Sequence, residues 1–282
     1  MLDRLRAAAR QKLQGAVAEV VEAQLDRSED RLEEQLAARH DESLGRLTKD
    51  LEDRLTAIEK RFTAVHDRLA EIEFRARRDI WYALDATAAQ ESAAYALKHF
   101  PKAPWFWHPH DTLRFALSKV NAPGLALEFG VATGTTLAII AEALSAEHTV
   151  VGFDTFTGLP ENWRTGFPAG TFSQRKAPDV PGAELVAGRF EDTLAEFLTG
   201  TDEQVAFLHI DSDLYSSAKT VLDLTGQRLA SGAVVVFDEF FNFPGWQQHE
   251  FRAWAEFIAC TGRAFDYLAY TGNNEQVAVR LH

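Results

Sequence analysis

The stretch from residue 205 to residue 241 predicts a strand, a helix and a second strand, with acidic residues where each strand ends. The apolar run VAFLHI leads into Asp211 and Asp213. The run AVVVF leads into Asp238 and Glu239. In an open α/β sheet the carboxyl ends of parallel strands face the ligand crevice, so we expect these acids to lie on one edge. Like charges so close together repel, which predicts that a metal ion or a cationic ligand lies among them.

Two expected strands upstream also end in acids. The run LALEF carries Glu128 and leads into a turn from Gly130 to Gly134, while the run TVVGF leads into Asp154. Glycine lets a ligand approach the backbone, and the helix N-terminus behind the turn favours negative charge. The spacing Glu-x-Gly-x-x-x-Gly differs from the Gly-x-Gly-x-x-Gly of nicotinamide sites, so a nicotinamide cofactor is disfavoured.

The same two acids indicate another kind of cofactor. An acid at the end of the second strand, such as Asp154, commonly holds ribose hydroxyls. A nucleoside whose reactive group is cationic suits Glu128 and Asp154 together. S-Adenosylmethionine has this chemistry, so we expect it as the cofactor.

From Pro123 onward the apolar runs predict alternating strands and helices, which is typical of an α/β fold. Strands are expected near 125–129, 149–153, 184–187, 205–210 and 233–237, and helices near 134–146, 191–199, 215–229 and 245–260. The runs AFDYLAY and QVAVRL are joined by a hairpin signal, so the sheet is expected to close with an antiparallel pair. The long loop from Phe156 to Gly182 is rich in Gly, Pro and aromatic residues and is a candidate lid or substrate loop.

Residues 1–78 contain no proline and predict a long helical stalk. Apolar residues recur in heptads in its second half, at Leu44, Leu51, Ile58, Val65 and Ile72, with an interleaved set at Thr48, Leu55, Phe62 and Leu69. A continuous helix of this length would reach about 115 Å. The pattern falters between His40 and Gly45, so two alternatives stay open. The segment self-associates or binds a partner helix as a coiled coil, or it forms a hairpin with a break at 41–45.

Residues 79–122 have a different character and predict a helical cap segment before the α/β domain at 123–282. We expect helices near 80–99 and 111–120, joined by a loop that holds Trp105, Phe106 and Trp107.

The acidic composition excludes several classes of partner. The formal net charge is −13 at pH 7, which argues against nucleic acid and anionic membranes as binding partners. Cys260 is the only cysteine, so we expect neither an intrachain disulfide nor a cysteine-based metal site, and a reducing, cytoplasmic setting fits. Charged residues near the N-terminus disfavour a signal peptide, and no apolar run is long enough to predict a transmembrane helix.

Four motifs resemble the macrocin O-methyltransferase family of class I S-adenosylmethionine-dependent methyltransferases. They are LEFGVATGTTL, FDTFTGLP, HIDSDLYSSAKTVLDLTGQRLASGAVVVFDE and PGWQQHE, and the resemblance covers about residues 95–282. It implies a doubly wound, Rossmann-like sheet of seven strands whose last pair is antiparallel. It also implies methyl transfer to a sugar hydroxyl with the assistance of Mg²⁺.

The resemblance also implies roles for the cofactor-side residues. Glu128 and the turn from Gly130 to Gly134 would face the methionine part of S-adenosylmethionine, and Asp154 would face the ribose. The acceptor would be a small molecule or a glycan.

On the metal side, the resemblance implies that Asp211, Asp238 and Glu239 bind Mg²⁺ and that Asp213 is the base. Members of the family often have a second Asp where this chain has Glu239. With the metal lowering the pKa of the sugar hydroxyl, Asp213 would remove its proton.

Roles can also be considered for Trp246, His249 and His209. Trp246 and His249 are three residues apart, so on one helix they would share a face. They either line the sugar pocket or pack in the core. His209 lies inside an apolar strand and is expected to be a satisfied core residue.

Two other classes of function remain as alternatives. A Mg²⁺-dependent phosphoryl-transfer or hydrolytic enzyme would also use acids at strand ends. It would need basic residues for phosphate, and between residues 205 and 250 only Lys219 and Arg228 occur, both expected on a helix away from the acidic edge. The second alternative is a coiled-coil scaffold with an inactive methyltransferase domain, against which the intact strand-end acids argue.

Overall fold

The computed structural model describes residues 2–282 of the chain, and it divides into two compact units, Met1–Arg78 and Asp79–His282. Met1, the first residue of the expected stalk, lies outside the described residues, as do the side chains of residues 3–8. The expected helical cap at 79–122 lies in the same unit as the sheet. Among residues 2–282, no helix combines the length and the apolar character needed to span a bilayer.

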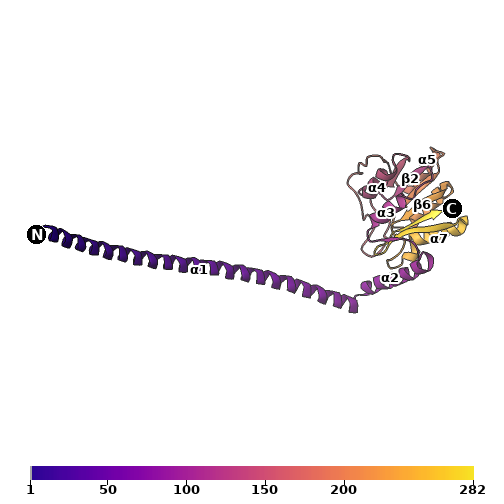
Figure 1. Cartoon of the computed structure of the whole chain (residues 1–282). Helices are drawn as coiled ribbons and strands as arrows, with labels where there is room; N and C mark the ends of the chain where they lie inside the picture. Colours follow the sequence, from indigo (N-terminus) through magenta and orange to yellow (C-terminus); the bar gives the residue numbers. More distant parts are fainter. Residues whose placement is uncertain (1) are drawn as a thin grey trace. The chain divides into compact units, whose positions relative to one another are not determined.

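The first unit is one helix, α1 (Leu2–Arg78), without interruption (Figure 1). The expected break at 41–45 is absent from it, which overturns the hairpin alternative. Gly45 lies inside the helix, because a single glycine lowers helix stability by only about 1 kcal/mol and α1 contains no proline. Exposed ion pairs one turn apart support the helix, among them Arg46 with Glu42 and Arg54 with Asp50.

The second unit is built on an eight-stranded sheet with the order β1-β7-β8-β6-β5-β2-β3-β4. The strands are β1 (Trp105–Phe106), β2 (Leu125–Phe129), β3 (Val150–Asp154), β4 (Glu184–Ala187), β5 (Val205–Ile210), β6 (Leu229–Phe237), β7 (Phe265–Thr271) and β8 (Val277–Leu281). β8 runs antiparallel to β6 and β7, and all other neighbouring strands are parallel. The α/β fold with a closing antiparallel pair is confirmed. The additional strand is β1, whose two residues are too short to show alternation in the sequence.

Helices cover both faces of this sheet, as in a doubly wound fold. They are α2 (Ile80–His99), α3 (Pro109–Leu117), α4 (Thr135–Leu144), α5 (Phe190–Thr199), α6 (Tyr215–Thr225) and α7 (Glu250–Thr261), with short 3-10 helices η1 (Gly226–Arg228) and η2 (Trp246–Gln248). Adjacent residues of β5 point to opposite faces, so Leu208 packs with α2, α5, α6 and α7, while Phe207 packs with α3 and α4. The strand runs are apolar throughout because both faces are buried.

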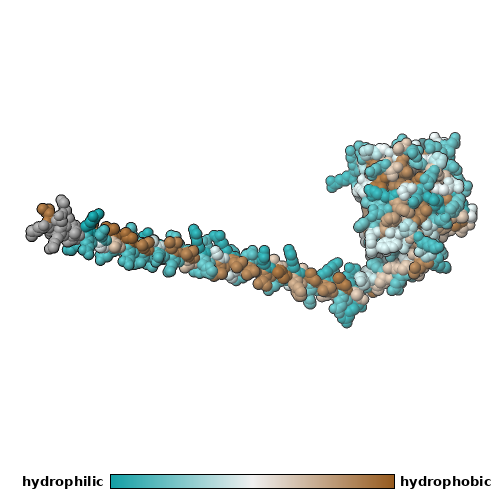
Figure 2. All heavy atoms as spheres, viewed as in Figure 1, coloured by the Kyte–Doolittle hydropathy of each residue, from teal (hydrophilic) through white to brown (hydrophobic). Residues whose placement is uncertain are grey.

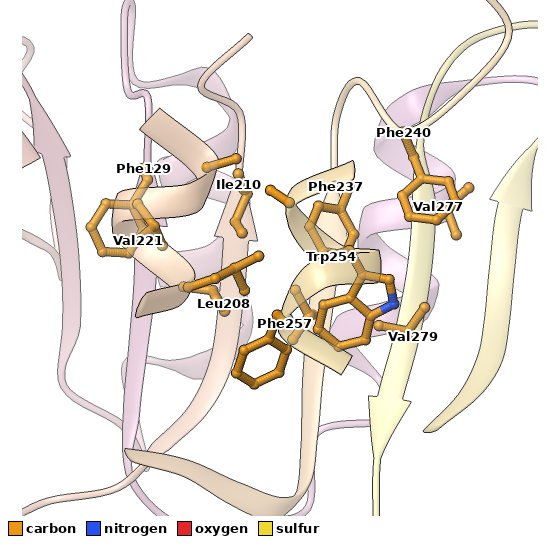
Figure 3. Packing of buried hydrophobic residues seen from close by; sticks show 14 of the residues in the cluster. Phe129, Leu208, Ile210, Val221, Phe237, Phe240, Trp254, Phe257, Val277 and Val279 are labelled. Carbon is orange, nitrogen blue, oxygen red and sulfur yellow. The ribbon is translucent and has the colours of Figure 1, made fainter. Parts of the chain in front are cut away.

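The larger of the two core layers is rich in aromatic residues. Figure 3 shows Val221 of α6 and Trp254 and Phe257 of α7 beside Leu208 of β5 and Phe237 of β6. The ring centroids of Phe237 and Trp254 are 5.3 Å apart in an edge-on arrangement. This packing fixes α7 against the strands whose ends carry the acids.

The expected helix at 245–260 is two elements in the structure. η2 ends at Gln248, and α7 begins at Glu250. His249 between them has φ −109° and ψ −131°, which is not helical. Gly245 precedes η2 with a positive φ of 83°, so the chain changes direction twice before α7 begins.

Replacing Trp254 should destabilise the sheet unit. Trp254 is 2% exposed, and Trp254→Ala is expected to lower the free energy of unfolding by about 3–5 kcal/mol because it leaves a cavity in the core. Urea denaturation followed by tryptophan fluorescence and circular dichroism would measure the change. The matched control is Trp107→Ala, since Trp107 is 61% exposed and its loss should change stability by less than about 0.5 kcal/mol. Equal effects of the two substitutions would contradict the assignment of Trp254 to the core.

Candidate active site

A cavity of about 440 Å³ lies at the carboxyl ends of β2, β3, β5 and β6. Residues after each of these strands line it, together with residues of the loop from Phe156 to Gly182 and the start of α5. They are Gly130, Ala132, Asp154, Thr155, Gly158, Leu159, Pro160, Trp163, Arg164, Phe167, Phe172, Arg189, Phe190, Glu191, Asp211, Ser212, Asp213, Ser217, Asp238 and Glu239. From β2 the chain adds β3 and β4 on one side of the sheet, and it then returns to add β5 and β6 on the other side, so the topological switch point lies between β2 and β5. Open α/β sheets bind ligands at such a point.

Asp154, at the end of β3, organises the glycine turn that follows β2. Its Oδ2 accepts hydrogen bonds from the backbone N–H groups of Val131 (2.9 Å) and Ala132 (2.8 Å). Its Oδ1 accepts one from the N–H of Phe156 at 2.7 Å. Asp154 is partly exposed and lines the cavity, so its carboxylate both holds the glycine turn and faces the space where a ligand would bind.

Gly130 joins this turn to the acidic loop after β5. Its φ is +98°, and a Cβ at this position would lie 1.7 Å from the backbone oxygen of Asp211. Any other residue would therefore push the two loops apart. Gly134 has φ +81° and precedes α4, where a Cβ would meet Val180 at 2.8 Å.

Glu128 lies behind the cavity rather than in its wall. It is fully buried, and its Oε1 is 2.8 Å from Nδ1 of His209. Burial raises the pKa of Glu128, and the hydrogen bond to His209 opposes the rise. His209 is buried as expected for a core residue, and its Nε2 lies 4.0 Å from Oδ1 of Asp238. Through His209, Glu128 is thus connected to the acidic edge.

Three of the strand-end acids meet at one point. One carboxylate oxygen from each of Asp211, Asp238 and Glu239 lies within 4.8 Å of the other two. Oε2 of Glu239 is buried and has no hydrogen-bond partner among the described residues. Hard divalent cations bind through carboxylate oxygens, so this donor set fits Mg²⁺.

Asp213 lies beside this cluster in an unusual backbone conformation. Its φ is +61°, in the left-handed region, where Asp is tolerated better than most residues. It lines the cavity and is only 6% exposed. The pKa of Asp213 is raised to about 7 by burial and by the charge of Asp238, while the Arg164 guanidinium acts in the opposite direction. Burial and the charge of Asp238 also raise the pKa values of Asp211 and Glu239 well above their usual range.

A further buried acid, Glu250, was missed in the sequence. It is the first residue of α7 and is fully buried, with its pKa raised well above the usual range chiefly by burial. One oxygen accepts from the N–H of Ser212 (3.4 Å) and the other from the N–H of Glu239 (3.0 Å). Glu250 therefore ties the loop after β5 to the loop after β6. The sequence does contain a signal for this role, because Glu250 lies at the start of a helix that follows the acidic loop after β6.

The loop from Phe156 to Gly182 adds a cation that the sequence analysis also missed. Arg164 forms an ion pair with both carboxylate oxygens of Glu275, at 3.0 and 3.1 Å. Its guanidinium carbon lies 3.9 Å from the ring centroid of Trp163 and 4.7 Å from that of Phe243. This arginine comes from a loop earlier in the chain than residues 205–250, in which only Lys219 and Arg228 are basic.

The basic residues considered earlier lie away from the acids, as expected. Lys219 pairs with Asp223 on the surface of α6, and Arg228 donates hydrogen bonds to the backbone oxygens of Leu198 and Thr201. Neither lines the cavity. Arg189 does line it and forms an ion pair with Glu191 at 3.3 Å.

Trp246 and His249 do not share a helical face, because the chain turns between η2 and α7. Trp246 is 3% exposed and packs edge-on against Tyr95 and Phe251, so it belongs to the core and is not among the residues that line the cavity. His249 also lies outside the cavity lining, but its ring is 6.5 Å from that of Trp163. Burial and the nearby Arg164 lower the pKa of His249.

We expect Glu250→Gln to weaken Mg²⁺ binding by about 10–100-fold, the usual effect of losing a group that orients metal ligands. The amide keeps the side-chain size but can accept only one of the two backbone hydrogen bonds. Titration calorimetry with Mg²⁺ would measure the affinity, and circular dichroism would show that the variant is folded. Glu256→Gln is the control, because Glu256 is a surface residue on the same helix. Wild-type affinity in Glu250→Gln would remove the positioning role.

Comparison with known proteins supports this arrangement. Residues 127–240 match the family model described as a methyltransferase domain. No curated protein sequence matches the chain. Among solved structures, the calicheamicin methyltransferase CalS11 is 23% identical, with a TM-score of 0.52 over 69% of this chain and 91% of that chain. The O-methyltransferase NovP is 21% identical, with a TM-score of 0.47 over 60% of this chain and 78% of that chain.

The matched segment begins in β2 and ends one residue after Glu239. It therefore contains the strand-end acids Glu128, Asp154 and Asp238 and the whole glycine turn. The likeness to CalS11 extends this agreement to the fold. Residues 127–240 of this chain are therefore similar in sequence to a methyltransferase domain, and the sheet unit has a fold like that of CalS11.

Proposed function

We propose that this protein is an S-adenosylmethionine-dependent O-methyltransferase that methylates a sugar hydroxyl with the assistance of Mg²⁺. The observation that carries the proposal is the composition of one cavity. Asp154 and the glycine turn occupy one side of it, and Asp211, Asp238 and Glu239 occupy the other, with Asp213 beside them. A cationic nucleoside and a metal-bound hydroxyl could therefore meet in one space.

On the cofactor side, the residues fit a nucleoside with a positively charged sulfur. Asp154 and Gly130 both line the cavity, where Asp154 would accept hydrogen bonds from ribose hydroxyls and Gly130 would leave the backbone open to the amino acid part. Bound S-adenosylmethionine supplies an activated methyl group. Glu128 contributes from behind the turn, by holding His209 rather than by lining the cavity.

On the metal side, the residues Asp211, Asp238 and Glu239 would hold Mg²⁺ through one oxygen each. Bound Mg²⁺ lowers the pKa of a hydroxyl that it ligates. Asp213 then accepts the hydroxyl proton at a carboxylate oxygen. Its buried position in the cavity wall beside the acid cluster supports this role.

The aromatic side chains in the cavity wall support the proposal that the acceptor is a sugar or another molecule with an apolar face. Trp163, Phe167 and Phe172 come from the loop between Phe156 and Gly182, and Phe190 comes from α5. Such rings pack against the C–H faces of sugars and keep water from the reacting atoms. The sequence motifs that resemble the macrocin O-methyltransferase family favour a sugar or glycan acceptor.

Phosphoryl transfer is a weaker candidate. Arg164 and Arg189 line the cavity and could contact phosphate, but each is already paired with a glutamate, Glu275 and Glu191. The methyltransferase domain match also speaks against it. An inactive scaffold would not be expected to keep five strand-end acids in the lining of one cavity, namely Asp154, Asp211, Asp213, Asp238 and Glu239.

Asp154→Asn tests the cofactor site. We expect its affinity for S-adenosylhomocysteine to fall by about 10–100-fold, because hydrogen bonds to an ionised carboxylate contribute about 1.5–3 kcal/mol each. Titration calorimetry would measure this, with Asp202→Asn as the control, since Asp202 is exposed before the amino end of β5. No binding of S-adenosylhomocysteine to the folded wild type, with or without Mg²⁺, would overturn the proposed function.

Asp213→Asn tests the base. The amide cannot accept the proton, so we expect kcat to fall by about 10²–10⁴-fold while the affinity for S-adenosylhomocysteine stays within about twofold. Release of S-adenosylhomocysteine with a panel of sugar acceptors and Mg²⁺ would measure turnover, and a chelator should abolish it in the wild type. The control is Asp223→Asn on the surface of α6. Wild-type kcat in Asp213→Asn would exclude Asp213 as the base.

A further inference from the structure

The C-terminal half of α1 exposes a regular band of apolar side chains, which we call the α1 stripe. Each of its members is between 44% and 75% exposed. They are Leu44, Leu51, Leu55, Ile58, Phe62, Val65, Leu69 and Ile72. Figure 2 shows hydrophobic residues along this part of the helix. Extended apolar surface of this kind marks a place where another chain binds.

The spacing of the α1 stripe defines a heptad register. Position a holds Thr48, Leu55, Phe62 and Leu69, and position d holds Leu51, Ile58, Val65 and Ile72. The alternation of three and four residues holds without interruption from residue 48 to residue 72. A repeat of this kind forms the seam of a left-handed coiled coil.

The positions that flank the seam carry opposite charges. Position g, just before each a residue, is arginine at 54, 61 and 68 and leucine at 47. Position e, just after each d residue, is glutamate at 52, 59 and 73 and histidine at 66. In parallel, in-register helices, a g residue faces the e residue five positions later in the second copy. Arg54 would then face Glu59 of the second copy, and Arg68 would face Glu73.

The antiparallel arrangement reverses this pattern. There g faces g and e faces e, so arginine would oppose arginine and glutamate would oppose glutamate along the seam. Within one helix Arg54 lies 3.2 Å from Asp50, and Arg68 lies 2.6 Å from Glu71. These exposed pairs are weak and compete little with partners across the seam. The charges therefore favour parallel copies of this same chain.

We propose that residues 44–76 form a parallel, in-register coiled coil with further copies of this chain. The core residues also set the number of strands. From residue 55 to residue 72, position d holds the β-branched residues Ile58, Val65 and Ile72, while position a holds Leu55, Phe62 and Leu69. Leucine at a with isoleucine at d favours three or four strands over two.

The mass of the full-length protein tests self-association. Light scattering coupled to size exclusion at micromolar concentration should give three or four times the mass of one chain. Phe62→Asp places a charge at position a and should give a single chain, while Lys60→Asp, at the outward position f, should leave the mass unchanged. A single-chain mass for the wild type would overturn the proposal and leave a helix of another protein as the occupant. A two-chain mass would overturn the strand number.

Charge exchange tests the parallel register. One variant carries Arg54→Glu and Arg68→Glu, and a second carries Glu59→Arg and Glu73→Arg. Each variant alone places like charges at the g and e contacts of parallel helices and should lose mass. In an antiparallel coil these contacts already pair like charges in the wild type, so each variant would keep its mass. A chain with all four substitutions restores opposite charges in parallel helices and is the matched control. Wild-type mass in each variant alone, or loss of mass in the control, would overturn the parallel arrangement.

A spin label gives an independent measure of orientation. Arg46→Cys places a label at position f in a Cys260→Ser background, which removes the only native cysteine. In parallel, in-register helices the labels should be about 20–30 Å apart, which is the width of the coil. In antiparallel helices centred on Lys60 they would be at least about 42 Å apart along the axis. The longer distance would overturn the proposal.

Discussion

The crowding of five carboxylates at one edge of the sheet is the constraint on which the catalytic unit depends. Asp211, Asp213, Asp238, Glu239 and Glu250 come from two strand ends and the first turn of α7. Burial raises the pKa values of Asp211, Asp213, Glu239 and Glu250, so the folded-state pKa values of these four groups lie above the unfolded values. Stability without a cation therefore falls as pH rises from the unfolded pKa values through the folded ones. A divalent cation that binds the ionised, folded site acts in the opposite direction.

The sheet keeps these acids together despite their repulsion. β5 and β6 are central strands with both faces buried. Glu250 joins the loops that follow them by accepting hydrogen bonds from backbone N–H groups of both loops. The aromatic packing of Trp254 and Phe257 holds α7, and with it Glu250, against the strands. Apolar burial at a distance thus fixes the position of charged groups that would otherwise separate.

The pairing of β2 with β5 links the cofactor side of the cavity to the metal side. Glu128 and His209 are direct neighbours in the register of these strands, and their side chains form the buried hydrogen bond. One step further along, Gly130 packs on the backbone of Asp211. Both contacts arise because β2 and β5 are neighbours at the topological switch point of the sheet. The cofactor side and the metal side of the cavity are therefore in direct contact through β2 and β5.

The parts of this arrangement that follow from local sequence could be predicted. An apolar run that stops at an acid fixes a strand and its end, which is why Asp154, Asp211 and Asp238 were placed on one edge. The contributions of Glu250 and Arg164 depend on which distant segments pack together, and no local pattern encodes that. The helical face expected to be shared by Trp246 and His249 is absent, because the spacing rule for a helix applies only if the helix is continuous. Two residues of β1 are too few to show any period.

The two units of the chain draw their stability from different sources. The sheet unit buries its apolar residues internally, whereas the large apolar side chains of α1 from Leu13 to Ile72 are exposed. A helix without tertiary packing depends on propensity and on pairs such as Arg46 with Glu42, each worth about 0.3–0.5 kcal/mol. In the proposed coiled coil, the remaining stabilisation of α1 would come from association, which depends on concentration. A single free energy of unfolding would then not describe the whole chain, because the stability of α1 would depend on concentration and that of the sheet core would not.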